Sequence, residues 1–225
     1  MIGEDRWKVT KIGEREEKTT KAFYLAPDHL LGEEGITESS CESYYYDPND
    51  PVRTHGAESL FQSRSEVGSL EQEKPFTRKD ILTWESEPLE ADLAIDGEVS
   101  VQLFVSSDCA DTAFSAKLSE VFSDGTAINI RSSITTLAYR GHADERMAYE
   151  PGTVVKAGID MWKVCWTLKK GSRLRLDISS SDFPQYSVHA NMPGIWSLQK
   201  ETRIAKQKVW MGEEYASRVL LPVRI

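Results

Sequence analysis

The chain has 225 residues, of which 40% are hydrophobic and 28% charged, and its formal net charge is −9 at pH 7. This composition is typical of an ordinary globular protein that is long enough to bury a core. Because a negative surface repels nucleic acid and anionic membranes, we expect neither as a partner. The sequence also lacks both an apolar run of the roughly 18 residues that a membrane-spanning helix needs and the pattern of a signal peptide.

The first 77 residues show no long helical periodicity and contain several turn signals. In the stretch at 46–51 two prolines flank Asn-Asp, and each proline biases the residue before it away from the helical region. Aromatic side chains such as Trp7 and Phe23 need a surface to pack on. We therefore predict that residues 1–77 form an irregular extension that wraps over a domain made of residues 78–225.

From residue 78 onward, short strands alternate with turns. Apolar and polar residues alternate at 99–105, 114–118, 162–168 and 174–178, with the period of two that is typical of half-buried strands. Further strands are expected at 128–130, at 134–139 and from 154. In the third alternating run Trp162 and Trp166 share one face, so both are expected in the core. At least seven strands with almost no helix between them predict an all-β sandwich or barrel.

The three cysteines are Cys41, Cys109 and Cys165, far apart in the sequence. An odd number of scattered cysteines without C-x-x-C spacing predicts free thiols that pack as small apolar side chains. This cysteine usage favours a cytoplasmic protein.

Residues 179–191, here called the signature segment, contain three consecutive serines, Asp182 and His189. The chain has no Gly-x-Ser-x-Gly elbow of the kind that presents an α/β-hydrolase nucleophile. We therefore favour a structural role, in which the serine hydroxyls and Asp182 satisfy backbone amides at the end of a strand. Phe183 is expected to turn inward and close the core. The alternative is a self-contained hydrolase that uses Ser180, Asp182 and His189.

Three other groups of residues suggest binding sites or ion pairs, but their sequence signals are weaker. Asp108, Asp111 and Asp124 could crowd a loop and bind calcium, although Asp108 and Asp111 are more simply explained as turn formers between two strands. Arg173 and Arg175 share one face of a strand and could pair with Asp177 or Asp182. No metal or cofactor is therefore expected. Trp84 and Trp196 could stack on sugar rings, which keeps a carbohydrate-binding module as an alternative function.

Several stretches carry a family resemblance. The run Gly-Ser-Arg-Leu-Arg-Leu-Asp-Ile-Ser-Ser-Ser-Asp-Phe-Pro at 171–184 is followed by His-Ala-Asn at 189–191, and further matching stretches lie at 3–7, 46–51, 105–114, 137–140 and 217–222. Together they resemble the C-terminal domain of Xaa-Pro dipeptidyl-peptidases and cocaine-esterase-like (CocE/NonD) acyl hydrolases. The residues of the main run that carry the resemblance are Arg175, Ser180, Asp182, Phe183, Pro184, His189 and Asn191. Ser172 and Ala113 stand where the family usually has histidine and aspartate.

The resemblance implies a jelly-roll β-sandwich of the galactose-binding-like type, with residues 1–77 similar to the connection from the hydrolase domain. In the family the catalytic serine, aspartate and histidine lie upstream, in an α/β-hydrolase domain. The resemblance therefore implies a non-catalytic domain that covers the catalytic domain and helps to form its substrate pocket. The implied partner is an α/β-hydrolase domain on the same or a neighbouring polypeptide, with self-association or participation in an active acyl or peptidyl hydrolase as alternatives.

Overall fold

The computed structural model describes residues 1–5, 7, 9, 17–58, 67–141 and 144–224. Within these ranges nearly all regular structure is β-strand, and the three helices are single 3₁₀ turns. In chain order the elements are β1 (Lys18–Ala26), η1 (Pro27–His29), β2 (Leu30–Gly32), β3 (Ser40–Tyr46), β4 (Leu82–Glu85), β5 (Leu93–Ser107), β6 (Ala113–Val121), β7 (Ala127–Thr136), η2 (Leu137–Tyr139), β8 (Val155–Leu168), β9 (Arg173–Ser179), η3 (Trp196–Leu198), β10 (Ala205–Met211) and β11 (Arg218–Arg224).

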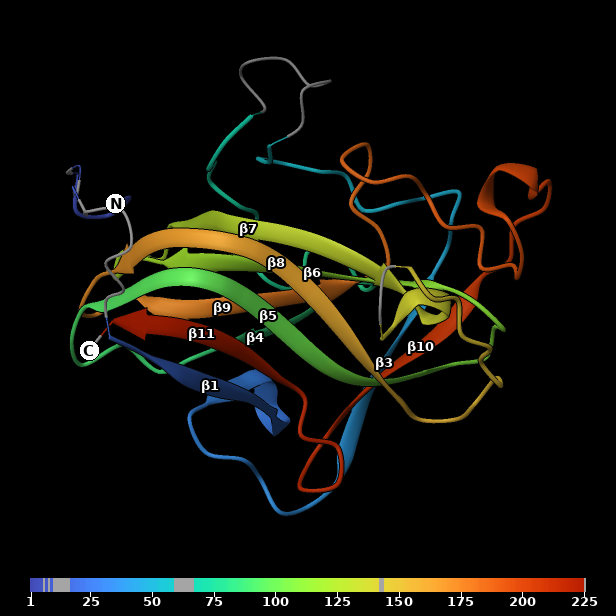
Figure 1. Cartoon of the computed structure of the whole chain (residues 1–225), viewed down its shortest axis with the longest axis horizontal. Helices are drawn as coiled ribbons and strands as arrows, with labels where there is room; N and C mark the ends of the chain where they lie inside the picture. Colours follow the sequence, from blue (N-terminus) through green and yellow to red (C-terminus); the bar gives the residue numbers. More distant parts are fainter. Residues whose placement is uncertain (6, 8, 10–16, 59–66, 142–143, 225) are drawn as a thin grey trace.

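The strands form two stacked layers (Figure 1). One layer has the order β8-β5-β11-β1, and the other has the order β7-β6-β9-β4. Strand β2 closes one edge of the sandwich, because it pairs with β1 and also forms a parallel bridge to β4 through Leu30 and Glu85. Strands β10 and β3 extend the first layer at one end. The predicted all-β sandwich is thus confirmed.

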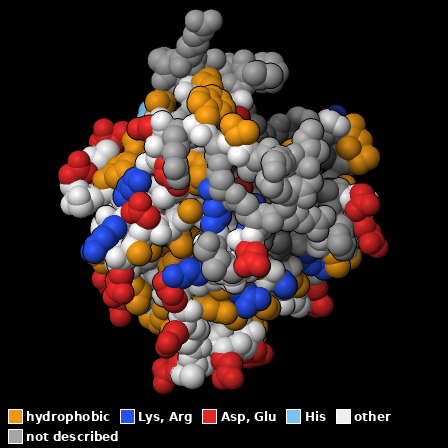
Figure 2. All heavy atoms as spheres, turned by 60° about the vertical axis from the view of Figure 1, so that its left-hand side comes forward, with side chains coloured by type: hydrophobic (Ala, Val, Ile, Leu, Met, Phe, Trp, Pro, Cys, Tyr) orange, Lys and Arg blue, Asp and Glu red, His pale blue; other side chains and the backbone are white. Residues whose placement is uncertain are grey.

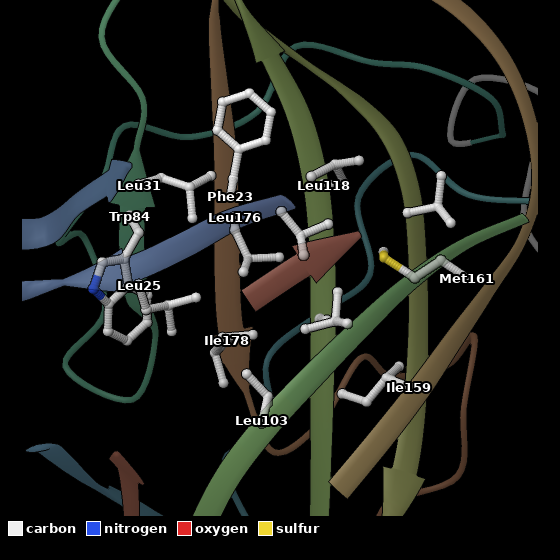
Figure 3. Packing of buried hydrophobic residues seen from close by; sticks show 14 of the residues in the cluster. Phe23, Leu25, Leu31, Trp84, Leu103, Leu118, Ile159, Met161, Leu176 and Ile178 are labelled. Atoms are coloured by element: carbon white, nitrogen blue, oxygen red, sulfur yellow. The ribbon is translucent and has the colours of Figure 1, made fainter. Parts of the chain in front are cut away.

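The core lies between the two layers, where the alternating residues of each strand point inward. The four apolar residues predicted for one face of β5, at 99, 101, 103 and 105, are all buried. Figure 3 shows Leu103 and Ile159 of the first layer in one cluster with Leu118 and Ile178 of the second. Burial of each such side chain contributes about 1.5–3 kcal/mol.

The N-terminal extension is more regular than predicted. Residues 47–58 and 67–77 follow an irregular course, but β1 pairs along its length with β11 and β3 pairs with β10. The sequence signal is weak because only the last part of each strand alternates. In β3, for example, only Tyr44 and Tyr46 are buried. These two strands belong to the same sandwich as the strands after residue 78.

Strand β8 contains a β-bulge that was not predicted. Glu98 of β5 pairs with Lys163 and Ser100 pairs with Asp160, so two residues, Met161 and Trp162, lie opposite a single residue of β5. The extra residue shifts the alternation, which leaves Met161 buried and Trp162 70% exposed. The prediction that Trp162 lies in the core is therefore wrong, whereas Trp166, beyond the bulge, is buried as predicted.

Figure 2 shows one face of the molecule, on which acidic and basic side chains are interspersed. Among the described residues, none of the helices has the length and apolar character needed to cross a membrane.

Candidate functional site

The signature segment begins at the end of β9 and pairs with residues 52–54 of the irregular stretch. The backbone N–H of Phe183 donates to the carbonyl of Val52 at 2.9 Å, and the N–H of Thr54 donates to the carbonyl of Phe183 at 2.7 Å. The hydroxyl oxygen of Ser181 accepts the N–H of Val52 at 2.9 Å. The expectation that the serines satisfy backbone amides is thus confirmed for Ser181.

The other two serines bond to side chains. The Ser180 hydroxyl shares a hydrogen bond of 2.8 Å with the Tyr44 hydroxyl and accepts one of 3.1 Å from Nε2 of Gln207. The Ser179 hydroxyl shares a hydrogen bond of 2.6 Å with that of Ser115. All three serines are buried. Ser179 links the signature segment to β6, and Ser180 links it to β3 and β10.

Asp182 is buried and bonds to β7 rather than to loop amides. Its Oδ2 atom accepts a hydrogen bond of 2.8 Å from the Ser132 hydroxyl. Its Oδ1 atom is buried without a hydrogen-bond partner among the described residues. Asp182, Ser115 and Ser132 also line a small cavity of about 30 Å³, which is enough for one water molecule. The prediction that Asp182 accepts loop amides is wrong, because its side chain points toward the sheet.

Phe183 does not close the core. Its ring is half-buried and packs against the guanidinium of Arg53, which lies 5.0 Å from the ring centroid. Pro184 is exposed. The prediction that Phe183 turns inward is wrong because pairing with residues 52–54 places this part of the segment outside the two layers.

His189 is buried beside Asp111 and has no contact with Ser180. Its Nε2 atom lies 3.6 Å from Oδ2 of Asp111, and its Nδ1 atom accepts the backbone N–H of Asn191 at 3.0 Å. A neutral imidazole that accepts at Nδ1 carries its proton on Nε2. Since Asp182 bonds to Ser132, the described contacts do not bring Ser180, Asp182 and His189 together as a triad.

Asn191 extends the network to β10. Its Oδ1 atom accepts the Thr112 hydroxyl at 2.7 Å, and its Nδ2 atom donates to the carbonyl of Arg203 at 2.7 Å. Gln207 bonds to both Thr112 and Ser180. Neither Thr112 nor Gln207 was predicted from the sequence, because an isolated polar residue in a strand carries no pattern that reveals a buried partner.

Two tyrosines of β3 complete this network. The Tyr46 hydroxyl donates to the carbonyl of His189 at 3.1 Å, and the Tyr44 hydroxyl bonds to Ser180. Burial raises the pKa of both tyrosines above the ordinary value of 10.0. Both hydroxyls therefore stay protonated and able to donate.

Arg175 fixes the irregular stretch on the outer face of the second layer. Its Nε atom donates to Oδ1 of Asp177 at 2.9 Å, and one terminal nitrogen donates to the carbonyl of Glu73 at 2.8 Å. The predicted ion pair with Asp177 is confirmed. The side chain of Asn129 holds the same stretch through the carbonyls of Gly56 and Gly68.

A groove of about 1460 Å³ lies between β7 and β8. Its lining comes from strand residues, from η2, from the signature segment and from residues 194–195. The lining residues include Arg131, Asp160, Trp162, Tyr139 and Ile195. Asp111 and His189 also line it. Strands β7 and β8 lie at the edge of the sandwich opposite the edge that β2 closes.

Residues 3–220 match the family described as the X-Pro dipeptidyl-peptidase C-terminal non-catalytic domain. The chain belongs to this family. The cocaine esterase of Rhodococcus sp. (strain MB1 Bresler) is 34% identical over 186 residues, which cover 82% of this chain and 32% of the esterase. A putative serine esterase of Mycobacterium bovis is 24% identical over 98% of this chain and 36% of its own length.

Solved structures show the same fold. An aminopeptidase from the marine sediment archaeon Thaumarchaeota archaeon matches 92% of this chain with a TM-score of 0.82 at 23% identity, and an α-amino acid ester hydrolase matches 91% with a TM-score of 0.79 at 23% identity. The match covers 37% and 36% of those two chains. The chain thus spans about a third of the length of these relatives.

The described residues give little support to the carbohydrate-binding alternative. Trp84 is fully buried, and its indole N–H donates to the carbonyl of Ala26 at 3.1 Å. The suggestion that Trp84 is a free stacking residue is wrong because β4 is an inner strand between β2 and β9. The side chain of Trp196 lies outside the described residues.

The three aspartates suggested for calcium serve separate contacts. Asp108 pairs with Arg203 at 3.1 Å, Asp111 accepts the N–H groups of Thr112 and Ala138, and Asp124 accepts the N–H of Thr126. No group of three acidic, histidine or cysteine side chains able to hold a metal occurs in the described part of the chain.

Proposed function

We propose that this chain acts as the non-catalytic part of a serine hydrolase, where it covers an α/β-hydrolase domain and helps to form the substrate pocket. Family membership and a length of about a third of the relatives support this proposal. The names of the relatives, an esterase, an aminopeptidase and an amino acid ester hydrolase, favour acyl or peptidyl substrates, including Xaa-Pro peptides, for the assembled enzyme.

The observation that carries the proposal is the bonding of Ser180. A serine nucleophile needs a base within hydrogen-bond reach, and that base must have a free nitrogen. Ser180 instead bonds to Tyr44 and Gln207, while His189 uses Nδ1 to accept a backbone N–H and turns Nε2 toward Asp111. The residues that could suggest a triad thus serve as structural links.

Labelling with a serine-directed fluorophosphonate tests the absence of a nucleophile. We expect the purified chain to remain unlabelled and to hydrolyse neither short acyl esters nor Xaa-Pro anilides. Stoichiometric labelling that Ser180→Ala abolishes would instead establish the self-contained hydrolase.

A fusion tests the covering role. In this fusion, residues 1–225 replace the matched C-terminal third of the Rhodococcus cocaine esterase. We expect the fusion to hydrolyse esters and to melt in one transition, whereas the esterase truncated at the same point loses both properties. A fusion no better than the truncated esterase contradicts the proposed function.

We also propose that the protein works in the cytoplasm, because all three cysteines are free. Cys41 and Cys165 are exposed and Cys109 is buried, so the predicted burial holds only for Cys109. Exposed free thiols suit a reducing compartment. Protein taken from cell extract under alkylating conditions should carry three blocked thiols, and an intermolecular disulfide through Cys41 or Cys165 would count against this location.

A further inference from the structure

We infer that the groove between β7 and β8, with Trp162 at its rim, is the surface on which the α/β-hydrolase domain docks. This inference rests on the proposed function and adds to it the docking face and an anchor residue. Four separate features of the described residues support it.

The first feature is the conformation of Trp162. Its backbone φ is 62°, a left-handed value that is unusual for a bulky residue. The β-bulge forces this conformation and turns the indole outward, where it is 70% exposed. Bulges of this kind re-aim side chains next to functional sites. The indole ring is largely exposed in this domain, so burial within the domain does not stabilise this conformation. We therefore expect a partner to bury the ring, and tryptophan is a frequent anchor in protein interfaces.

The second feature is the set of apolar side chains around Trp162. Tyr139 and Ile195 line the groove and are exposed. Exposed Leu198 belongs to the same turn as Ile195, since its backbone N–H donates to the Ile195 carbonyl. Arg131, Asp160 and Lys163 line the groove as well. A lining that combines exposed apolar side chains with charged groups of both signs fits a protein interface.

The third feature is the open edge of the sandwich. Strand β7 pairs with β6 and strand β8 with β5, and their facing edges carry only isolated bridges among the described residues, from Glu71 to Ile128 of β7 and from Ile2 to Trp166 of β8. The gap between them is bridged by the Nε atom of Arg131, which donates to the carbonyl of Met161 at 3.0 Å, and by the N–H of Gly158, which donates to the carbonyl of Arg140 at 2.9 Å. Proteins normally cover such edges. The groove volume of about 1460 Å³ exceeds the roughly 300–1,000 Å³ of a small-molecule site, which favours a protein surface as the occupant.

The fourth feature is the position of the first residues. Ile2 pairs with β8, because its N–H donates to the carbonyl of Cys165 at 3.3 Å and its carbonyl accepts the N–H of Thr167 at 3.0 Å. In the family this domain is C-terminal, so a catalytic domain would precede Met1. The chain from that domain would therefore arrive beside β8, three residues beyond Trp162.

Hydroxyl-radical footprinting of the fusion described above tests the docking face. We expect oxidation of Trp162 to fall about fivefold or more in the fusion relative to the isolated chain, as expected for a ring that enters a dry interface core. Tyr45, an exposed aromatic residue on β3, should react equally in both. Equal oxidation of Trp162 in an active fusion overturns the inference and leaves the proposed function standing. An inactive fusion that melts in two transitions contradicts the proposed function itself.

A pair of variants separates docking from folding. Trp162→Ala should lower the melting temperature and the ester hydrolysis of the fusion while the isolated chain melts as before. Tyr45→Ala is the matched control and should leave the fusion unchanged. If both variants leave the fusion unchanged, or if Trp162→Ala lowers the melting temperature of the isolated chain by as much as that of the fusion, Trp162 is not a docking anchor.

Discussion

Asp182 has one carboxylate oxygen on the Ser132 hydroxyl and a second that is buried without a described partner. We expect Asp182→Ala to destabilise the protein by about 1–3 kcal/mol, because the buried Ser132 hydroxyl loses its acceptor. Asp182→Asn should cost less, since the amide oxygen can accept the same hydrogen bond. Urea melts of both variants measure the difference. A loss with Asn as large as that with Ala would show that the negative charge itself is required.

Stability at alkaline pH depends on three buried acids. Burial raises the pKa of the Cys109 thiol to about 11 and raises the pKa of Tyr44 and Tyr46 above 10.0. In the unfolded chain cysteine and tyrosine titrate near ~8.5 and ~10. Above about pH 8.5 the unfolded chain therefore binds fewer protons than the folded chain, so the free energy of unfolding falls as pH rises.

Urea midpoints at pH 7, 9 and 10.5 check this dependence, and we expect a clear decrease from the second to the third. Tyr44→Phe serves as a control. It lowers stability at every pH, because Ser180 loses a partner, but it makes the alkaline decrease smaller. A midpoint that stays constant up to pH 10.5 would contradict the effect of burial on these groups.

At the scale of single elements, the bulge in β8 leaves Met161 in the core and the adjacent Trp162 at the surface. A left-handed conformation costs a non-glycine residue about 1–2 kcal/mol, and glycine loses roughly 0.5–1 kcal/mol in entropy. Trp162→Gly should therefore change the stability of the isolated chain by less than about 1 kcal/mol. Met161→Ala should cost about 2–5 kcal/mol, because Met161 is fully buried. Equal losses in the urea melts of the two variants would mean that Trp162 supports the fold.

The elements that the sequence predicts well are those with sustained alternation. In β5, β6 and β9 apolar residues alternate with polar ones at 99–105, 114–118 and 174–178, and the apolar residues named there in advance are all buried. The pattern fails where the backbone departs from regular pairing. Nothing in the sequence around Trp162 requires a left-handed residue, so the bulge is set by pairing with β5. Residues 137–139, expected to continue a strand, form the 3₁₀ turn η2.

The contacts of the signature segment could not be predicted from the sequence either. The sequence identified Ser180, His189 and Asn191 by resemblance. Their respective partners Tyr44, Asp111 and Thr112 come from parts of the chain that are distant in sequence. A hydrogen bond between such distant parts is fixed only when the sandwich closes. The sequence could therefore name the residues of the site without their contacts.

At the scale of the whole molecule, strands β1 to β3 are part of the sandwich. Strands β1 to β3 bury Phe23, Leu25, Leu31, Tyr44 and Tyr46. Burial contributes about 1.5–3 kcal/mol for each such side chain, so their combined contribution is as large as the whole stability of a typical domain, about 5–15 kcal/mol.

We therefore expect deletion of residues 1–46 to abolish cooperative folding, with loss of the thermal transition monitored by circular dichroism. Deletion of residues 1–17 is the control, because it removes the Ile2 bridge to β8 but leaves β1 whole. This shorter deletion should lower the melting temperature only modestly. If the chain without residues 1–46 still melts in one sharp transition, the strands after residue 78 fold alone, and the division of the chain at residue 77 is a boundary between two folding units.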